Sequence, residues 1–390
     1  MANTEESLRN LLSKIAQEQN YENPEIVINA ISSGGANYTS NLYTAIIRGK
    51  NKEDLHLFAK VAAVGEKFRS EIPIDFFGNE QLAYTELWKI YAALEEEHGV
   101  PEEHRVLYTK CYGIDDTLYK ETMVLENLIA QGYQECDRFK PVDWEYASAA
   151  FTECAKLHAL SFAFRKYRPD EYDNLCKSFK SSWEHMDMES IILNSIKVAV
   201  TAIKPEHKKS FEKFMKDDPA QHLVKLFSAQ RAEVIVHGDF RGSNLLHRVR
   251  EDGKVDIKVV DLQTLQLGSP IADLIYFIFA GSDEKFRAKY FDKLFEHYYT
   301  QLSASLSRLN LNPDEIYSKE DFYADFKEKL PYGLTIALSS LAVVTIDTAD
   351  APKVDESLGM SAFSEMKTSD LYTERLNEVV NDYVRWGILH

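Results

Sequence analysis

The segment HGDFRGSN at residues 237–244, followed by VVD at residues 259–261, decides the fold of this chain. A short run of apolar residues precedes the functional groups of each segment, as is typical of a buried strand that runs into a loop. Asp239 lies in the glycine-containing loop, Asn244 follows five residues later, and Asp261 ends the second apolar run. The pattern predicts that these three side chains point at the same place.

Two carboxylates and one amide oxygen, carried by loops between apolar strands, are hard oxygen ligands that suit Mg²⁺. An Asp that accepts a hydroxyl proton beside a phosphate-bound Mg²⁺ is the arrangement used for phosphoryl transfer. The loop also contains His237, which we expect to hold the loop by hydrogen bonds, and Arg241. From the sequence, Arg241 either contacts a phosphate group or is solvated.

The N-terminal part of the chain supplies two further groups that this chemistry requires. Strands are predicted over residues 25–32, 42–48, 55–61 and 120–125, and a helix over residues 76–97. Lys60 lies on the third strand, and Glu80 lies on the apolar stripe of the helix, three residues after Phe77. A carboxylate on the buried face of a helix needs a partner, so we expect Glu80 to pair with Lys60.

Several further motifs, taken in order, resemble those of a known family. The pattern H-G-D-x-x-x-x-N with a strand-ending Asp resembles the aminoglycoside phosphotransferase and choline kinase branch of the protein-kinase-like fold. The chain is more closely similar to the ecdysteroid-kinase-like family. The motifs that carry this resemblance are GANYTS at residues 35–40, FGNEQLAY at 77–84, VLENL at 124–128, LHALS at 157–161 and GSPIADL at 268–274.

The resemblance implies a fold and a role for each matching residue. The fold is α+β and bilobal, with an antiparallel sheet and one main helix in the first lobe, residues 1–125. Residues 126–128 form a hinge, and residues 129–390 form a large, mostly helical second lobe. ATP and Mg²⁺ would be the cofactors. By resemblance, Asp239 is the catalytic base, and Asn244 and Asp261 bind Mg²⁺. Lys60 binds the α- and β-phosphates, Glu80 orients Lys60, and Asn37 and Ser40 lie at the phosphates. Glu126 and Leu128 offer backbone groups to adenine, and Asp273 braces the catalytic loop.

The sequence departs from the family pattern at Phe240–Ser243, where other residues usually follow the catalytic Asp, and at Leu262 and Asn127. None of these departures removes a catalytic group. His158 is expected to be a hydrogen-bonded core residue.

Composition limits the class of protein further. The chain has 390 residues, enough for two lobes, each with its own core. Its formal net charge of −17 argues against nucleic acid or anionic membrane as partners, and no apolar run is long enough for a membrane span. The first residues lack the pattern of a secretory signal. The four cysteines include no C-x-x-C pair, which indicates reduced thiols. We therefore expect a cytoplasmic protein. No obligate protein partner is evident.

The acceptor of the phosphate is expected to be a small molecule. Only eight residues separate Asp261 from Pro270, too few for the long activation loop on which protein kinases dock peptides. The substrate cleft would then be built from residues 141–230 and 284–390, which are mostly helical by pattern. The family resemblance suggests a hydroxylated, largely apolar acceptor, such as an ecdysteroid or a xenobiotic alcohol. A cationic acceptor of the choline or aminoglycoside kind, and an inactive nucleotide-binding scaffold, remain as alternatives.

Overall fold

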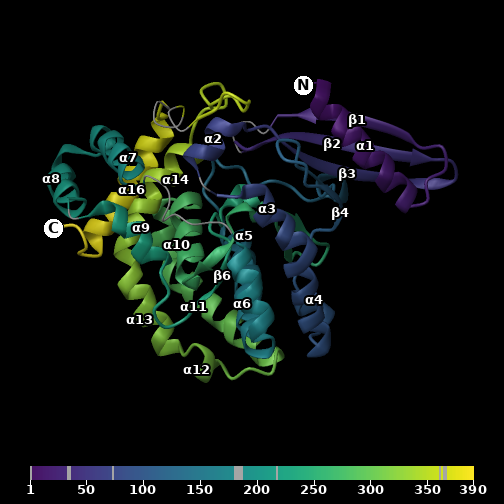
Figure 1. The fold of residues 1–390 in the computed structure, drawn as a ribbon. Coiled ribbons are helices and arrows are strands. Elements are labelled where there is room, and N and C mark those ends of the chain that lie inside the picture. The colour runs from purple at the N-terminus through teal and green to yellow at the C-terminus, as the bar shows by residue number, and fades with distance from the viewer. Residues whose placement is uncertain are drawn as a thin grey trace.

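The structure is a computed structural model that describes residues 2–32, 37–72, 74–179, 188–216, 218–359, 362 and 367–390. It has a smaller lobe built around a sheet and a larger, helical lobe (Figure 1). The bilobal α+β architecture predicted from the sequence is confirmed, while the residue boundaries proposed for the lobes stay predictions.

The smaller lobe is a five-stranded antiparallel sheet with the order β1-β2-β3-β5-β4. Its strands are β1 (Glu25–Ile31), β2 (Ser40–Gly49), β3 (Lys52–Ala62), β4 (Cys111–Asp115) and β5 (Thr122–Glu126). Successive side chains of a strand point to opposite faces of the sheet. On β3, Leu57, Ala59 and Val61 are buried on one face, so Lys60 points to the other face, toward the second lobe.

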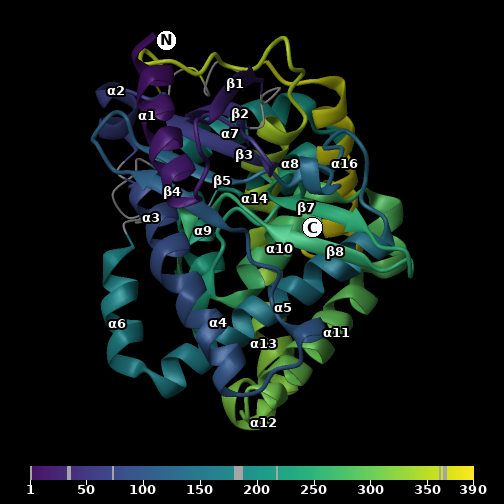
Figure 2. The same ribbon diagram turned by 90° about the vertical axis from the view of Figure 1, so that its right-hand side faces the viewer.

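Helix α1 (Ala2–Glu18) covers the outer face of this sheet (Figures 1 and 2). The apolar face expected for this helix packs against the inward side chains of β2 and β3, and its buried residues include Leu8, Leu11, Leu12 and Ile15. Because α1 closes one face, the opposite face of the sheet is the one that faces the second lobe.

The helix predicted over residues 76–97 is present, with one interruption. It consists of α3 (Phe76–Leu82), a π-helical turn (Ala83–Leu87) and α4 (Trp88–Glu97), and the short helix α2 (Glu66–Glu71) precedes it. Asp75 caps the start of α3 by accepting a hydrogen bond from the Gly78 N–H at 2.9 Å. Glu80 is buried, as expected from its place on the apolar stripe.

The larger lobe is formed by helices and two short antiparallel sheets. Strand β6 (Val234–Val236) pairs with β9 (Gln266–Gly268), and β7 (Leu245–Val249) pairs with β8 (Val255–Val259). Its helices are α5 (Trp144–Tyr167), α6 (Pro169–Ser178), α7 (Met188–Ala202), α8 (Pro205–Phe214), α9 (Pro219–Phe227), α10 (Pro270–Gly281), α11 (Glu284–Arg308), α12 (Pro313–Ile316), α13 (Lys319–Lys329), α14 (Gly333–Val344) and α16 (Asp370–Arg385). Helices α5, α10 and α11 share one aromatic core in which Phe151 contacts both Phe277 and Phe295.

Three details differ from the expectation. Strand β4 was not predicted, because its five residues, CYGID, show no alternation of apolar and polar side chains. The strand expected over residues 120–125 begins at Thr122 and ends at Glu126. Residues 346–359, expected to be helical, contain no helix. The glycine turn predicted over residues 33–37 lies outside the described residues except for Asn37.

All four cysteines are free, and Cys154 is buried. Within the described ranges, no helix combines the length and the apolar character needed to cross a membrane.

Candidate active site

A cavity of about 180 Å³ lies between the two lobes, and most of the predicted site residues line it. The predicted residues in its wall are Asn37, Lys60, Glu80, Glu126, Leu128, Asn244 and Asp261. Ser40 instead lines a larger, neighbouring cavity of about 1190 Å³, whose wall includes Asn37 but neither Lys60 nor Asp261. Of the predicted charged residues, Lys60, Glu80, Glu126 and Asp261 therefore line the smaller cavity.

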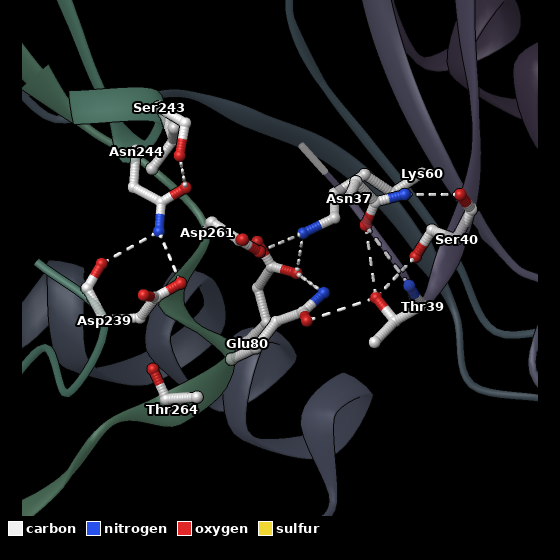
Figure 3. A network of polar contacts seen from close by, with 12 residues as sticks. Asn37, Thr39, Ser40, Lys60, Glu80, Asp239, Ser243, Asn244, Asp261 and Thr264 are labelled. Carbon is white, nitrogen blue, oxygen red and sulfur yellow. Dashed lines mark hydrogen bonds and ion pairs between the residues drawn. The ribbon is translucent and has the colours of Figure 1, made fainter. Parts of the chain in front are cut away.

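Lys60 joins the two lobes at the centre of this site (Figure 3). Its Nζ lies 2.6 Å from Glu80 Oε2, which is the predicted pair, and 2.6 Å from Asp261 Oδ1. Burial disfavours the charged ammonium, but the nearby carboxylates of Asp261 and Glu80 outweigh this effect and raise the pKa of Lys60. Lys60 is therefore held as a cation against two groups that come from different lobes.

Asp261 reaches this position because the backbone turns sharply at the end of β8. Its φ is +63°, a left-handed conformation that is uncommon for a residue with a side chain and that is often found at functional sites. Burial raises the pKa of the Asp261 carboxyl, but the charges of Lys60, Arg241 and His237 outweigh burial and lower it below its usual value. Asp261 is thus ionised at neutral pH.

Asp239 lies beside Asn244 in the loop between β6 and β7 (Figure 3). Asn244 Nδ2 donates to Asp239 Oδ2 at 3.0 Å and to the Asp239 carbonyl at 2.9 Å. Arg241 Nε donates to both carboxylate oxygens of Asp239, at 2.9 and 3.0 Å. Arg241 is buried, so the solvated alternative left open by the sequence is wrong. Tyr276 of α10 also hydrogen-bonds Asp239, a contact that no local sequence pattern predicts.

The predicted brace of the catalytic loop is present. Asp273, near the start of α10, accepts hydrogen bonds from the His237 N–H at 2.8 Å and the Gly238 N–H at 2.9 Å. Burial raises the pKa of Asp273, but its contacts with His158 and His237 outweigh burial and lower it. Gly238 has a φ of +79°, and a Cβ there would lie 2.5 Å from the Thr264 carbonyl oxygen, so only glycine fits.

Both histidines have the bonding roles expected of them. His237 Nε2 lies 2.9 Å from the Val260 carbonyl oxygen and so connects the catalytic loop to the strand that leads to Asp261. His158 is fully buried, with Nδ1 2.7 Å from the Tyr298 hydroxyl and Nε2 3.2 Å from Asp273 Oδ2.

The donor set at Asn244 and Asp261 fits a small divalent cation. Because the Asn244 Nδ2 donates to Asp239, its Oδ1 is the atom available as a ligand. Asp261 carries a negative charge, and both side chains line the cavity. A carboxylate and an amide oxygen are ligands that Mg²⁺ prefers.

At the hinge, the side chain of Glu126 contacts other protein groups. It accepts hydrogen bonds from Gln131 Nε2 at 2.6 Å and the Lys110 N–H at 3.1 Å, and it pairs with Lys258. Burial raises the pKa of Glu126, but these contacts outweigh it and lower the pKa. The Asn127 N–H donates to the His56 carbonyl at 3.1 Å. The Glu126 N–H donates to the Lys110 carbonyl at 2.9 Å, and the Leu128 carbonyl accepts from the Gln131 and Tyr133 N–H groups at 3.0 Å. The contribution of Glu126 and Leu128 to adenine binding stays a prediction.

Asn37, expected at the phosphates, bonds within its own loop. Its Nδ2 lies 2.5 Å from the Ser40 carbonyl oxygen, and its Oδ1 lies 3.3 Å from the Thr39 hydroxyl. The Thr39 hydroxyl also reaches Gln263, a residue that sequence reasoning missed because nothing in its local pattern distinguishes it.

The comparison with family models identifies the chain. The model of the ecdysteroid kinase-like family matches residues 34–311, which is more than half of the chain. This chain belongs to the ecdysteroid kinase-like family. In this ecdysteroid kinase-like protein the matched segment contains Lys60, Glu80, the catalytic loop, Asp261 and Asp273. A comparison with curated proteins gives no match.

Solved structures of small-molecule kinases are among the neighbours of this ecdysteroid kinase-like protein. The GDP and kanamycin complex of APH(2″)-IIia is 9% identical, with a TM-score of 0.43, over 83% of this chain and 89% of that one. A choline/ethanolamine kinase family protein from Mesorhizobium loti is 14% identical, with a TM-score of 0.36, over 87% and 100% of the two chains. Glucosamine kinase is 13% identical, with a TM-score of 0.37, over 96% and 84%.

Proposed function

We propose that this protein transfers the γ-phosphoryl group of ATP to a hydroxyl of a small, largely apolar acceptor, such as an ecdysteroid or a hydroxylated xenobiotic. The observation that carries the proposal is the meeting of Lys60, Asp261, Asn244 and Asp239 at one interlobe site. The first two groups come from different lobes, so the site exists only in the folded chain.

Each group has a defined part in the reaction. The Lys60 ammonium binds phosphate oxygens, and Asn244 and Asp261 hold Mg²⁺. Bound Mg²⁺ supplies positive charge against the phosphates. As the acceptor oxygen forms its bond to the γ-phosphorus, the bond from that phosphorus to the β,γ-bridging oxygen breaks, and its electron pair leaves with ADP. Asp239 accepts the hydroxyl proton of the acceptor.

The segment between Asp261 and α10 supports a small acceptor. It forms a short turn and then β9, which pairs with β6, so it offers no extended platform for a peptide. Arg241 bears on the charge of the acceptor. Its guanidinium lies 2.9 Å from Asp239 and offsets the charge of that carboxylate, so Asp239 attracts a cationic amine less, which favours a neutral alcohol over a choline-like or aminoglycoside-like acceptor.

The test is a reaction of the protein with ATP, Mg²⁺ and a pool of steroids, glycosides and amino alcohols, read by mass spectrometry. We expect a gain of about 80 mass units, one phosphoryl group, on a neutral alcohol. Asp239→Asn should lower turnover by about 10²–10⁴-fold while the affinity for ATP changes little. Asp173→Asn, at an exposed position on α6, is the matched control and should behave as wild type.

Faster transfer to an amino alcohol or aminoglycoside than to any neutral alcohol would overturn the acceptor class alone. A folded wild-type protein that binds no ATP in the presence of Mg²⁺ would contradict the whole proposal, and so would near-normal turnover in Asp239→Asn. Thermal unfolding of each variant checks that the fold is intact.

A further inference from the structure

Gln263 connects the two lobes at the active site. It lies in the short turn Leu262–Thr264, two residues after Asp261, and its side chain is buried. Its Nε2 donates to Glu80 Oε2 at 3.2 Å, and its Oε1 accepts from the Thr39 hydroxyl at 3.2 Å. Its backbone carbonyl also accepts from Asn79 Nδ2 at 3.1 Å. A single residue of the larger lobe thus contacts two separate elements of the smaller lobe.

The chemistry of the amide determines how these contacts are arranged. Glu80 Oε2 already accepts a hydrogen bond from the Lys60 ammonium, so the amide nitrogen of Gln263 must face Glu80 and its oxygen must face Thr39. Glu80 Oε2 is the same oxygen that lies 2.6 Å from Lys60 Nζ. Gln263 and Lys60 therefore donate to the same oxygen of Glu80, the group expected to orient Lys60.

Thr39 belongs to the segment that precedes β2 and that is expected to lie over the phosphates. Its one hydroxyl proton can be given to Gln263 Oε1, at 3.2 Å, or to a neighbour in its own segment, Asn37 Oδ1 or Ser40 Oγ, both at 3.3 Å. A hydrogen bond to Gln263 connects this segment to the larger lobe. A hydrogen bond to Asn37 or Ser40 stays within the smaller lobe. Gln263 therefore competes with Asn37 and Ser40 for the hydroxyl proton of Thr39.

We infer that Gln263 is a positioning residue that couples the Thr39 segment to the group formed by Lys60, Glu80 and Asp261. The position of Thr39, directly before β2, and the alignment of Lys60 then depend on each other. The inference rests on the proposed function, because it assigns the nucleotide phosphates to this site.

The first test is a double-mutant cycle on ATP binding, with Mg²⁺ present, measured by calorimetry. Thr39→Val and Gln263→Met are close in size to the native residues and remove the contact from either side. Each should weaken ATP binding by about two- to tenfold, the range for one hydrogen bond. The double variant should bind no more weakly than the weaker single variant, because the same contact is lost. Thr39→Ser keeps the hydroxyl and should restore binding.

The second test separates the two contacts of the amide. Gln263→Glu keeps an oxygen for Thr39 but places a second carboxylate against Glu80, and like charges repel at this distance. We expect kcat to fall by about tenfold or more, whereas Thr39→Val should mainly raise the KM for ATP. Glu80→Gln added to Gln263→Glu returns one donor to the pair and should recover part of the lost kcat.

Two exposed positions supply controls of the same chemistry, Thr85→Val on the π turn and Gln17→Glu on α1, and both should match wild type. If the loss of ATP affinity in the double variant equals the product of the losses in Thr39→Val and Gln263→Met, the inference is wrong and the proposed function stands. If the wild-type protein binds no ATP, the proposed function fails, and the inference fails with it.

Discussion

At the scale of single residues, the helix that carries Glu80 holds a second buried carboxylate. Glu95 of α4 accepts hydrogen bonds from the Val106 N–H at 2.8 Å and from the Tyr108 hydroxyl at 2.9 Å. Burial nevertheless dominates and raises the pKa of Glu95 to about 7. Unlike Glu80, Glu95 has no cation as its closest partner, and its environment therefore favours the protonated form.

We predict that Glu95 makes the stability of the protein fall as the pH rises. Between the unfolded pKa, about 4.5, and the folded pKa, about 7, the folded chain keeps a proton that the unfolded chain loses. Stability contributed by this group declines across that window, and the cost is complete above pH 7. Glu95→Gln removes this dependence, so its melting temperature relative to wild type should be several degrees higher at pH 8 than at pH 5.

The exposed neighbour Glu96→Gln is the control for this measurement and should show no such pH dependence. A difference between Glu95→Gln and wild type that stays constant from pH 5 to pH 8 would contradict the assignment.

At the scale of elements, α10 holds the catalytic loop through its first turn. Asp273 uses both carboxylate oxygens to accept the backbone N–H groups of His237 and Gly238. These amides are buried and have no solvent to replace a lost acceptor. The position of Asp239, one residue beyond Gly238, therefore depends on a helix that follows it by more than thirty residues.

We predict that Asp273→Asn lowers both stability and turnover. An amide offers one acceptor oxygen where the carboxylate offers two, so one buried N–H would face another donor. The expected loss of stability is about 1–3 kcal/mol, measured by denaturant unfolding. Turnover should fall with it because the loop shifts. Asp292→Asn, exposed on α11, is the control, and equal stability of the two variants would refute the role of Asp273.

At the scale of the whole molecule, a segment far from the hinge also connects the two lobes. Besides the hinge, the segment after α14 returns from the larger lobe to the smaller one and passes beside α2 (Figures 1 and 2). Its Leu358 is 4% exposed and packs in a cluster with Val64, Phe68 and Ile72. The Glu356 carbonyl lies so close to Gly65 that a Cβ there would be 2.8 Å from it. This second connection restrains the relative position of the lobes.

We predict that Leu358→Ala destabilises the protein by about 2–5 kcal/mol, because it empties part of this interlobe cluster. The measurement is denaturant unfolding, and the control is Leu118→Ala, at a position that is 64% exposed. A loss no larger than that of the control would show that the segment does not hold the lobes together.

The sequence by itself determined the parts of this protein that depend on local spacing. The interval between Asp239, Asn244 and Asp261 predicted that these side chains lie near one another, because short intervals between strands restrict where side chains can point. Their catalytic and metal-binding roles stay proposals. Helical periodicity placed Glu80 on a buried face, and strand alternation placed Lys60 on the face opposite Ala59 and Val61.

Only the tertiary structure decided the contacts that join distant parts of the chain. Gln263 meets Thr39 across 224 residues, Tyr276 reaches Asp239 from a neighbouring helix, and Leu358 packs against α2 from the far end of the chain. Periodicity shows which face of an element is buried but not which residue covers it. That choice is made when whole elements pack together, so it is not encoded in any short stretch of sequence.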